Sequence, residues 1–306
     1  MKWLALLGVV GAVSTAHGYV ETLSKHGNPV AWPASCVVLQ PDARGDRSGD
    51  AIDLATIDAT LASAVGNWNG ACAGCTYMRL GVVKAYQALD AVSDGRPSVV
   101  FRSDFWGRGG IAYDDSIIAL TTVWFVTSAT RTDGQITDAD IELNAVNYSF
   151  SVNATTDTPR DGTMLADLEN TLTHEIGHVM GLGHTCWDHV LPEPPLDNDG
   201  NPAPDCDLRT MLPAKVRDAT MYPYAEPGSV SMRTLQPDDI AGVCDHYPST
   251  ATPTACYTDI VSRGCDVTPA SPASPGSPAS PASPRWWLAV VPFAGLLWRV
   301  RRRGIV

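Results

Sequence analysis

One stretch decides the fold of this chain, and it reads His174-Glu175-Ile176-Gly177-His178-Val179-Met180-Gly181-Leu182-Gly183-His184. His174 and His178 lie four positions apart, so on a helix both imidazoles project from one face, where they can bind one metal ion. Gly181 and Gly183 favour the left-handed backbone that ends a helix, which would bring His184 back to the same ion. The stretch therefore predicts a helix that carries a three-histidine zinc site.

The glutamate of this stretch has a separate role. Three neutral histidines leave one position of a tetrahedral zinc open, and a water bound there has a pKa of about 7. Glu175 is not placed to bind the metal itself, so we expect it to accept that water's proton as a general base. A chance pattern on an ordinary helix is the competing interpretation, and the added Gly181 and His184 argue against it.

The pattern His-Glu-x-x-His-x-x-Gly-x-x-His at positions 174–184 resembles the signature of the metzincin zinc peptidases. That family places a methionine turn beneath the metal, and residues 219–223, with Met221 at their centre, are similar to that turn. The Met-Tyr-Pro form and the later segment 235–243 resemble the matrixin branch. The resemblance implies an α/β architecture of the α+β class: a metzincin fold with a twisted, mixed, five-stranded sheet, an active-site helix and a small C-terminal subdomain.

The matrixin resemblance also places the substrate. In that arrangement a peptide adds a strand to the antiparallel edge strand above the zinc, here residues 117–127. Pro223 and Tyr224 would line the pocket for the residue after the scissile bond. The strand residues expected to pair with the substrate are Ala119, Leu120, Thr121 and Thr122.

The activity implied by the resemblance is zinc-dependent endopeptidase hydrolysis of extracellular proteins. The expected partner is a protein or peptide substrate, and the chain is expected to be a monomer. A catalytically silent, zinc-stabilised surface adhesin is the alternative, although it would not need Glu175. Zinc amidase or deacetylase chemistry is a third possibility, and it would not need the methionine turn. The second, structural zinc of vertebrate-type matrixins is not expected, because no histidine lies between Gly27 and Thr173.

Calcium is considered at one loop. Asp197-Asn198-Asp199-Gly200-Asn201 alternates oxygen ligands around a glycine, as calcium loops do. No glutamate follows at the spacing of an EF-hand, so an ordinary turn is favoured over a Ca²⁺ site at Asp197 and Asp199. The same long segment contains Cys186 and Cys206, which could close a loop of about 20 residues.

Composition points to an exported globular protein. The 306 residues are 44% apolar, and the net charge of −12 argues against nucleic acid or an anionic membrane surface as partners. Residues 1–18 read as a signal peptide, with Lys2 before an apolar run and small residues at its end. We therefore expect an extracellular or outer-surface location. An even set of eight cysteines then predicts disulfides without fixing their connectivity: Cys36, Cys72, Cys75, Cys186, Cys206, Cys244, Cys256 and Cys265.

Two of these cysteine pairs can be interpreted locally. Cys72 and Cys75 form a Cys-x-x-Cys pattern with no second copy, so a structural disulfide is favoured there over a redox or zinc pair. Cys256 and Cys265 are expected to pair with each other, although Cys265 could instead be a processing or lipidation point. The resemblance raises latency through a propeptide cysteine, which is not expected here because no Pro-Arg-Cys-Gly-type segment occurs; Cys36 stays open as such a thiol until its partner is known.

The chain divides into four parts. After the signal peptide we expect a matrixin-like catalytic domain at 19–250, a cysteine-containing extension and Pro/Ala/Ser linker at 251–284, and a hydrophobic-basic tail at 285–306. The tail is apolar over residues 286–298, which is short for a membrane span, and arginines follow. It resembles the C-terminal sorting tails of some Gram-negative surface proteins. We expect it to contact a membrane or sorting machinery, as an anchor or a sorting signal.

Hydrophobic periodicity predicts the remaining elements. Helices are expected at residues 50–68, 163–180 and 237–246, with Asp161 capping the second. Strands are expected at residues 36–39, 98–102, 117–127 and 136–143.

Overall fold

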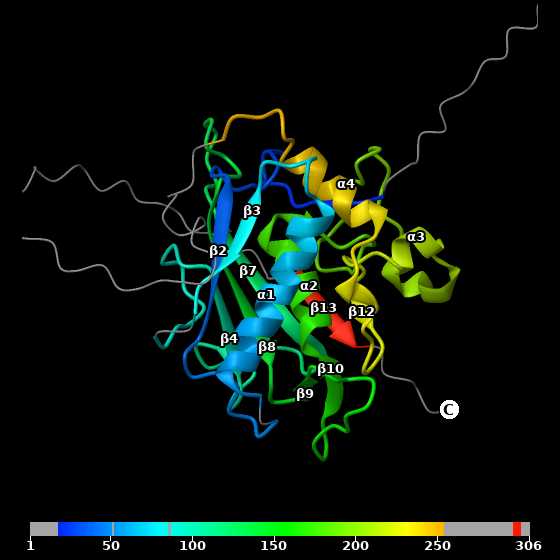
Figure 1. The fold of residues 1–306 in the computed structure, drawn as a ribbon. Coiled ribbons are helices and arrows are strands. Elements are labelled where there is room, and N and C mark those ends of the chain that lie inside the picture. The colour runs from blue at the N-terminus through cyan, green and yellow to red at the C-terminus, as the bar shows by residue number, and fades with distance from the viewer. Residues whose placement is uncertain (1–17, 51, 85–86, 254–295, 301–306) are drawn as a thin grey trace, which may run out of the picture.

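The computed structural model describes residues 18–50, 52–84, 87–253 and 296–300, which form an α+β fold (Figure 1). Its longer helices are α1 (Leu54–Ala71), α2 (Leu168–Val179) and α4 (Pro237–His246), and its short helical turns are η1 (Cys206–Met211), α3 (Ala214–Arg217) and η2 (Ser231–Arg233). The strands are β1 (Val20–Glu21), β2 (Cys36–Pro41), β3 (Arg79–Val82), β4 (Ser98–Arg102), β5 (Gly107–Arg108), β6 (Ile111–Ala112), β7 (Ile117–Phe125), β8 (Ile136–Asn144), β9 (Tyr148–Ser151), β10 (Met164–Asp167), β11 (Leu182–Gly183), β12 (Tyr224–Ala225) and β13 (Leu296–Val300). Most of the predicted signal peptide, most of the linker and the expected Cys256–Cys265 pair lie outside the described residues.

A mixed five-stranded sheet forms the centre of the fold, in the order β7-β8-β4-β2-β3. The strands from β8 to β3 run parallel, and β7 runs antiparallel to β8. β13 and β12 continue the sheet beyond β7, so β7 has neighbours on both sides. The α+β class and the mixed five-stranded sheet predicted from the sequence are therefore confirmed, with two short strands added at one end.

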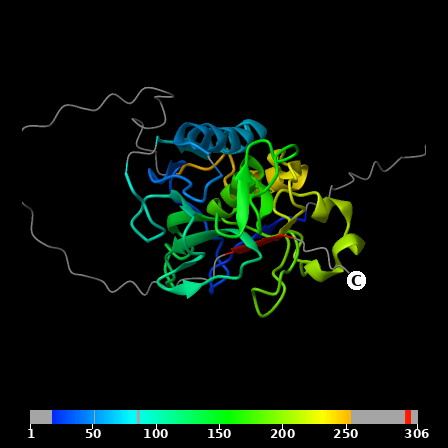
Figure 2. The ribbon, with the colours of Figure 1, turned by 90° about the horizontal axis from the view of Figure 1, so that it is seen from below.

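The two long helices α1 and α2 cover one face of this sheet and pack against each other (Figure 2). The apolar positions of α1 point into the core, where Ile57, Leu61 and Trp68 are buried. The Trp68 indole N–H donates to the Thr173 carbonyl oxygen at 2.9 Å, a contact between the two helices in the core. Burial of these large side chains fixes α2, and with it His174 and His178, relative to the sheet.

The start of the histidine helix differs from the prediction. Residues Met164–Asp167 form β10, which pairs in parallel with β9, and α2 begins only at Leu168. Asp167 caps the helix by accepting the Asn170 amide, and the Arg233 guanidinium also binds its carboxylate. Asp161 is exposed and lies outside the helix. The predicted cap at Asp161 is wrong because strand pairing holds the intervening residues extended.

Disulfides join segments that are far apart in the sequence. Cys186 pairs with Cys206, as the sequence allowed, and Cys75 pairs with Cys244 of α4. Cys36 is also disulfide-bonded, so it offers no free thiol to a metal. Cys72 keeps a buried thiol, and burial raises its pKa to about 11. The structural disulfide predicted at the Cys72-x-x-Cys75 pattern is therefore wrong for Cys72, because Cys75 pairs with the distant Cys244 and leaves Cys72 as a thiol.

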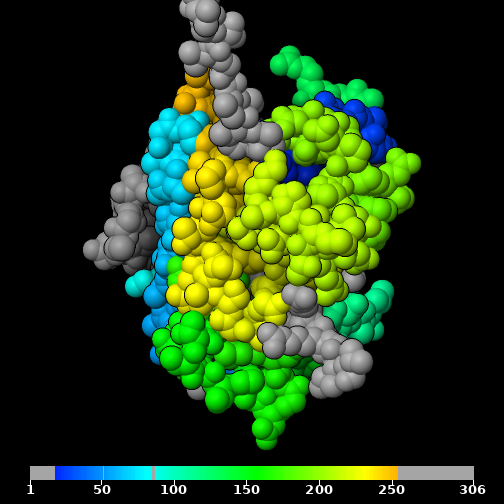
Figure 3. Space-filling view, turned by 90° about the vertical axis from the view of Figure 1, so that its right-hand side faces the viewer, coloured from blue at the N-terminus to red at the C-terminus, as the bar shows by residue number. Residues whose placement is uncertain are grey.

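Two of the described segments that follow helix α2 are a lobe between residues 185 and 220 and strand β13. The segment between residues 185 and 220 forms a lobe beside α4 on the face shown in Figure 3. The described part of the C-terminal tail is strand β13. Among the described residues, none of the helices combines the length and apolarity that a membrane crossing requires.

A buried carboxylate on β8 should make stability depend on pH. Asp140 is fully buried; one oxygen accepts the Ser98 amide and hydroxyl, and the other has no partner. Burial raises the pKa of Asp140 to about 7, and Asp138 nearby raises it further. Because the folded state then holds the proton more tightly than the unfolded chain, the free energy of unfolding should fall as the pH rises from about 4 to 7.

We expect Asp140→Asn to flatten this dependence and to raise the free energy of unfolding at pH 8 by on the order of 1–2 kcal/mol. Urea unfolding between pH 5 and 8, with a chelator present so that metal binding does not contribute, measures both quantities. Asp161→Asn, which changes an exposed carboxylate, is the control and should keep the wild-type slope. An unchanged slope in Asp140→Asn would contradict the assignment.

Candidate metal centre

Helix α2 and the turn after it bring three imidazoles together. The Nε2 atom of His178 lies 3.1 Å from Nε2 of His174 and 3.1 Å from Nε2 of His184. All three side chains are buried, at 0 to 4% exposure. Two nitrogen ligands of a tetrahedral zinc lie about 3.3 Å apart when each Zn–N bond is about 2.0–2.1 Å. The spacing therefore suits ligation of one ion.

The return of His184 depends on one glycine. Gly181 has φ of 87°, and a Cβ there would lie 2.1 Å from the Val30 carbonyl oxygen, so only glycine fits. Gly183 is different, because it lies in β11, paired with Val20 of β1, and has no positive φ. The left-handed backbone expected at Gly183 is wrong, because the chain reverses at Gly181 and then pairs as an extended strand.

The hydrogen bonds of the three rings orient their free nitrogens. Nδ1 of each ring lies at a hydrogen-bond acceptor: the Thr220 carbonyl at 2.6 Å for His174, the Leu182 carbonyl at 2.8 Å for His178, and Asp188 Oδ2 at 2.8 Å for His184. Each Nδ1 therefore carries the proton, and each Nε2 presents a lone pair.

Protonation of His174 and His178 is disfavoured. Burial, together with the neighbouring imidazoles, lowers the pKa of His174 well below its usual value. Burial and His184 lower the pKa of His178 in the same way. Lone pairs on His174 and His184, each 3.1 Å from that of His178, repel it unless a cation lies between them. The residues present therefore fit a divalent metal, and a set of three imidazoles, with no further ligand grouped with them among the described residues, suits a catalytic zinc.

Glu175 lies beside the histidines with one oxygen unused. Its Oε2 atom accepts a 2.5 Å hydrogen bond from the Thr121 hydroxyl of β7, and its buried Oε1 atom has no partner. Burial raises the pKa of Glu175 to about 8, against the opposing effect of the Thr121 hydrogen bond. A buried carboxylate oxygen without a partner is costly, so its presence here points to a role with a bound ligand.

The methionine turn lies directly against the metal-binding helix. A Cβ on Gly177 would lie 2.2 Å from the sulfur of Met221, so the glycine makes room for this side chain. Asp239 of α4 accepts the Thr220 and Met221 amides at 2.9 and 3.1 Å, which fixes the turn. Met221 is thus buried against the helix that carries His174 and His178, and its role as a methionine turn stays a prediction.

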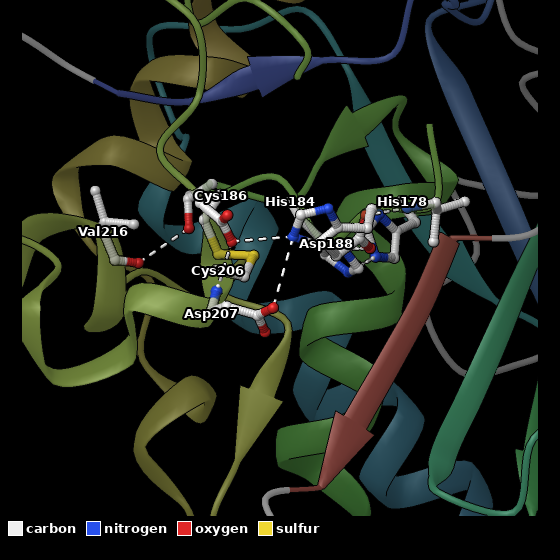
Figure 4. The surroundings of a disulfide bond; sticks show 11 residues. His178, His184, Cys186, Asp188, Cys206, Asp207 and Val216 are labelled. Atoms are coloured by element: carbon white, nitrogen blue, oxygen red, sulfur yellow. Dashed lines mark hydrogen bonds and ion pairs between the residues drawn. A yellow bond between two sulfur atoms is a disulfide. The ribbon is translucent and has the colours of Figure 1, made fainter. Parts of the chain in front are cut away.

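Asp188 is a site residue that the sequence analysis did not identify. It orients the third imidazole through the Asp188–His184 contact, and it lies just after Cys186 of the Cys186–Cys206 disulfide (Figure 4). Its position four residues after the last histidine was the available signal. A carboxylate on the far nitrogen of a metal-binding histidine fixes the tautomer and raises the basicity of the ligand.

The residues expected to bind substrate lie on two sides of this centre. Ala119 to Thr122 belong to β7, and Thr121 reaches Glu175 directly. Pro223 is buried, and Tyr224 begins β12. β13 lies between β7 and β12 and pairs with both. The strand edge that the sequence assigns to a substrate is therefore already paired.

A cavity of about 250 Å³ opens beside His184. Its walls come from the N-terminal segment around β1, from β7, and from the loop that the Cys186–Cys206 bond closes. A cavity with this lining accepts an apolar side chain of a ligand held at the metal centre. The apolar side chains that line it include Val20, Leu23, Val123, Phe125, Trp187 and Leu191.

Two other clusters contain residues that can bind metals, and both include aspartates. One Asp197 oxygen accepts the Asp199 and Asn201 amides, as in an ordinary turn, and calcium there stays a prediction. His189 lies 3.0 Å from Asp205 in an exposed cluster that also includes Asp207. Among the described residues, the buried group of three histidines is the one whose ligand atoms converge without exposure to water.

A scan against models of known protein families finds no match, and a search of curated proteins finds no matching sequence.

Metal analysis should find one zinc per chain after dialysis against a zinc-containing buffer. His178→Ala removes the central ligand, so we expect zinc affinity to fall by more than about 100-fold. His189→Ala is the matched control, because it removes a histidine from the exposed cluster, and it should keep the wild-type stoichiometry. Zinc retained by His178→Ala and lost by His189→Ala would contradict the assignment of the site.

Asp188→Asn should weaken zinc binding by about 10- to 100-fold, because the ring of His184 loses the charge of its partner while an acceptor oxygen remains. Competition titration with a chromogenic chelator measures the change. The Asp207→Asn variant, in the exposed cluster, is the control and should bind zinc as the wild type does. An unchanged affinity in Asp188→Asn would show that this carboxylate does not support the site.

Proposed function

We propose that this chain is an exported zinc-dependent endopeptidase with a metzincin fold of the matrixin type. The observation that carries the proposal is the meeting of three buried, unprotonated imidazole nitrogens with a buried carboxylate oxygen that has no partner. Three histidines would hold the metal: His174, His178 and His184. When bound, the zinc supplies a Lewis acid for the substrate carbonyl and a more acidic water.

Glu175 is suited to move the proton in this reaction. Its free Oε1 atom can take the proton from the attacking water and then give it to the leaving amine nitrogen. Thr121 holds the other oxygen at 2.5 Å, so the carboxylate keeps one orientation during both transfers. The geometry is that of a positioned acid and base, which a purely structural zinc site does not require.

The strands around the centre favour a polypeptide substrate. β7, which contains Ala119 to Thr122, and the short strand β12 already bind one extended segment between them, namely β13. An extended peptide binds such strands by main-chain hydrogen bonds. Met221 beneath the histidines supports a metzincin over an amidase or deacetylase.

Export agrees with the covalent structure of the domain. The Cys75–Cys244 and Cys186–Cys206 disulfides need an oxidising compartment. The acidic composition fits a monomeric protein outside the cytoplasm that acts on other proteins and does not bind nucleic acid. The hydrophobic-basic end of the chain is then a tether or a sorting signal.

Glu175→Gln should lower kcat for cleavage of casein by at least about 100-fold, because the amide cannot accept a proton, while zinc stays bound. Activity with and without a chelator, together with metal analysis, separates the two effects. Glu169→Gln is the control on the same helix; Glu169 binds Arg233 and Ser63, so this variant should keep its activity. Peptidase activity retained in Glu175→Gln would exclude the base role, and a zinc-loaded protein that never cleaves would favour the adhesin.

A further inference from the structure

The C-terminal strand β13 occupies the place between the two sides of the candidate site. It pairs antiparallel with β7, with Leu296 opposite Thr121 and Trp298 opposite Ala119. It also pairs in parallel with β12, with Arg299 opposite Tyr224. One short strand thus satisfies main-chain groups on both sides of the groove (Figure 4).

The register brings this strand to the reacting groups. Leu296 lies opposite Thr121, whose hydroxyl donates to Glu175 at 2.5 Å. The strand therefore begins opposite the residue whose hydroxyl holds the Glu175 carboxylate. A peptide bound for hydrolysis has to pass the same point, so β13 and a substrate cannot both occupy it.

Without β13 this side of the sheet would be open. β7 is nine residues long, and β8 pairs along its other side. A long strand with one unpaired edge is a template for any extended peptide, and proteins cover such edges. Here the cover comes from residues 296–300, which 42 intervening residues separate from the last described residue of the domain.

We propose that the groove between β7 and β12 is a binding site for an extended peptide and that its resident ligand is the chain's own C-terminal segment around residues 296–300, which blocks the groove against other peptides. The ligand class is an apolar strand followed by arginines, as in Leu296–Val300 and the arginines at 301–303. The interpretation of this groove as a blocked substrate site rests on the proposed peptidase function. The interpretation of the groove as a peptide-binding site does not depend on that function.

Two physical effects favour the resident strand over a free peptide. The strand belongs to the same chain as the groove, and covalent linkage of a ligand to its site can give an effective concentration of about a millimolar. The tail also carries positive charge: Arg299, Arg301, Arg302 and Arg303, in a chain whose net charge is −12. Attraction between the two adds to the main-chain pairing and should weaken as the salt concentration rises.

The test uses the full chain with two prolines placed in β13, Leu297→Pro together with Trp298→Pro. Successive residues of a strand direct their N–H groups to opposite sides, so two adjacent prolines remove at least one donor to β7. The matched control places two prolines in the Pro/Ala/Ser linker, Ala279→Pro with Ser280→Pro. The β13 variant, the linker control and a protein with the wild-type tail all carry Glu175→Gln, so that no bound peptide is cut.

The readout is the fluorescence anisotropy of a labelled peptide with the sequence of residues 294–303. We expect the β13 variant to bind it at least about tenfold more tightly than the wild-type tail or the linker control, because the resident strand no longer competes. The same peptide with prolines at the two positions keeps its charge and should not bind. Equal affinity for all three proteins, or no binding to the β13 variant, would overturn the proposal.

Hydrogen exchange gives a second measurement that needs no added peptide. Amides in residues 117–121 of β7 should exchange faster in the β13 variant than in the wild-type tail and the linker control, while β8 amides stay protected. Equal exchange in all three would also overturn the proposal. If the binding pattern holds but the protein with an intact Glu175 cleaves nothing even with the two prolines in β13, the peptidase function fails and the groove assignment stands.

Discussion

The constraint on which this structure depends is the convergence of three buried imidazole lone pairs. Without a cation the Nε2 atom of His178 would repel those of His174 and His184, each 3.1 Å away, so the fold has to hold the rings in place by other means. It does so from outside the helix. Each ring has its Nδ1 atom at an acceptor on a different segment: Thr220, Leu182 and Asp188.

Those acceptors explain why distant parts of the chain belong to one unit. The Thr220 carbonyl is positioned by Asp239 of α4, and the Asp188 carboxylate by a loop closed through Cys186 and Cys206. Gly181 can approach the Val30 carbonyl only because it has no side chain. The candidate metal centre is therefore assembled by α4, the disulfide loop and the N-terminal segment, and α2 supplies only two of its three histidines.

Much of this could be predicted from local patterns. The strand at residues 98–102 and the helix at 237–246 have the predicted bounds, because their apolar spacing and flanking residues are decided within a few positions. The three histidines and Glu175 followed from spacing alone. Asp188 and Thr121 did not follow from spacing. The contact of Asp188 with His184 depends on how the disulfide loop approaches the ring, and the contact of Thr121 with Glu175, 54 positions away, depends on how β7 approaches α2. The helix start was missed for the same reason, because β10 exists only through its pairing with β9.

The tail shows where sequence reasoning reaches its limit in physical terms. An apolar run followed by arginines suits a membrane surface, and the same residues suit the edge of a sheet. The two uses exclude each other for residues 296–300, because main-chain groups paired with β7 cannot at the same time form helical hydrogen bonds inside a bilayer. Which use prevails depends on what else is present, a membrane or only the chain's own groove. A tail that leaves the groove for a membrane would uncover β7 at the location where the protein is anchored, so attachment and access to the metal centre would be coupled through one strand.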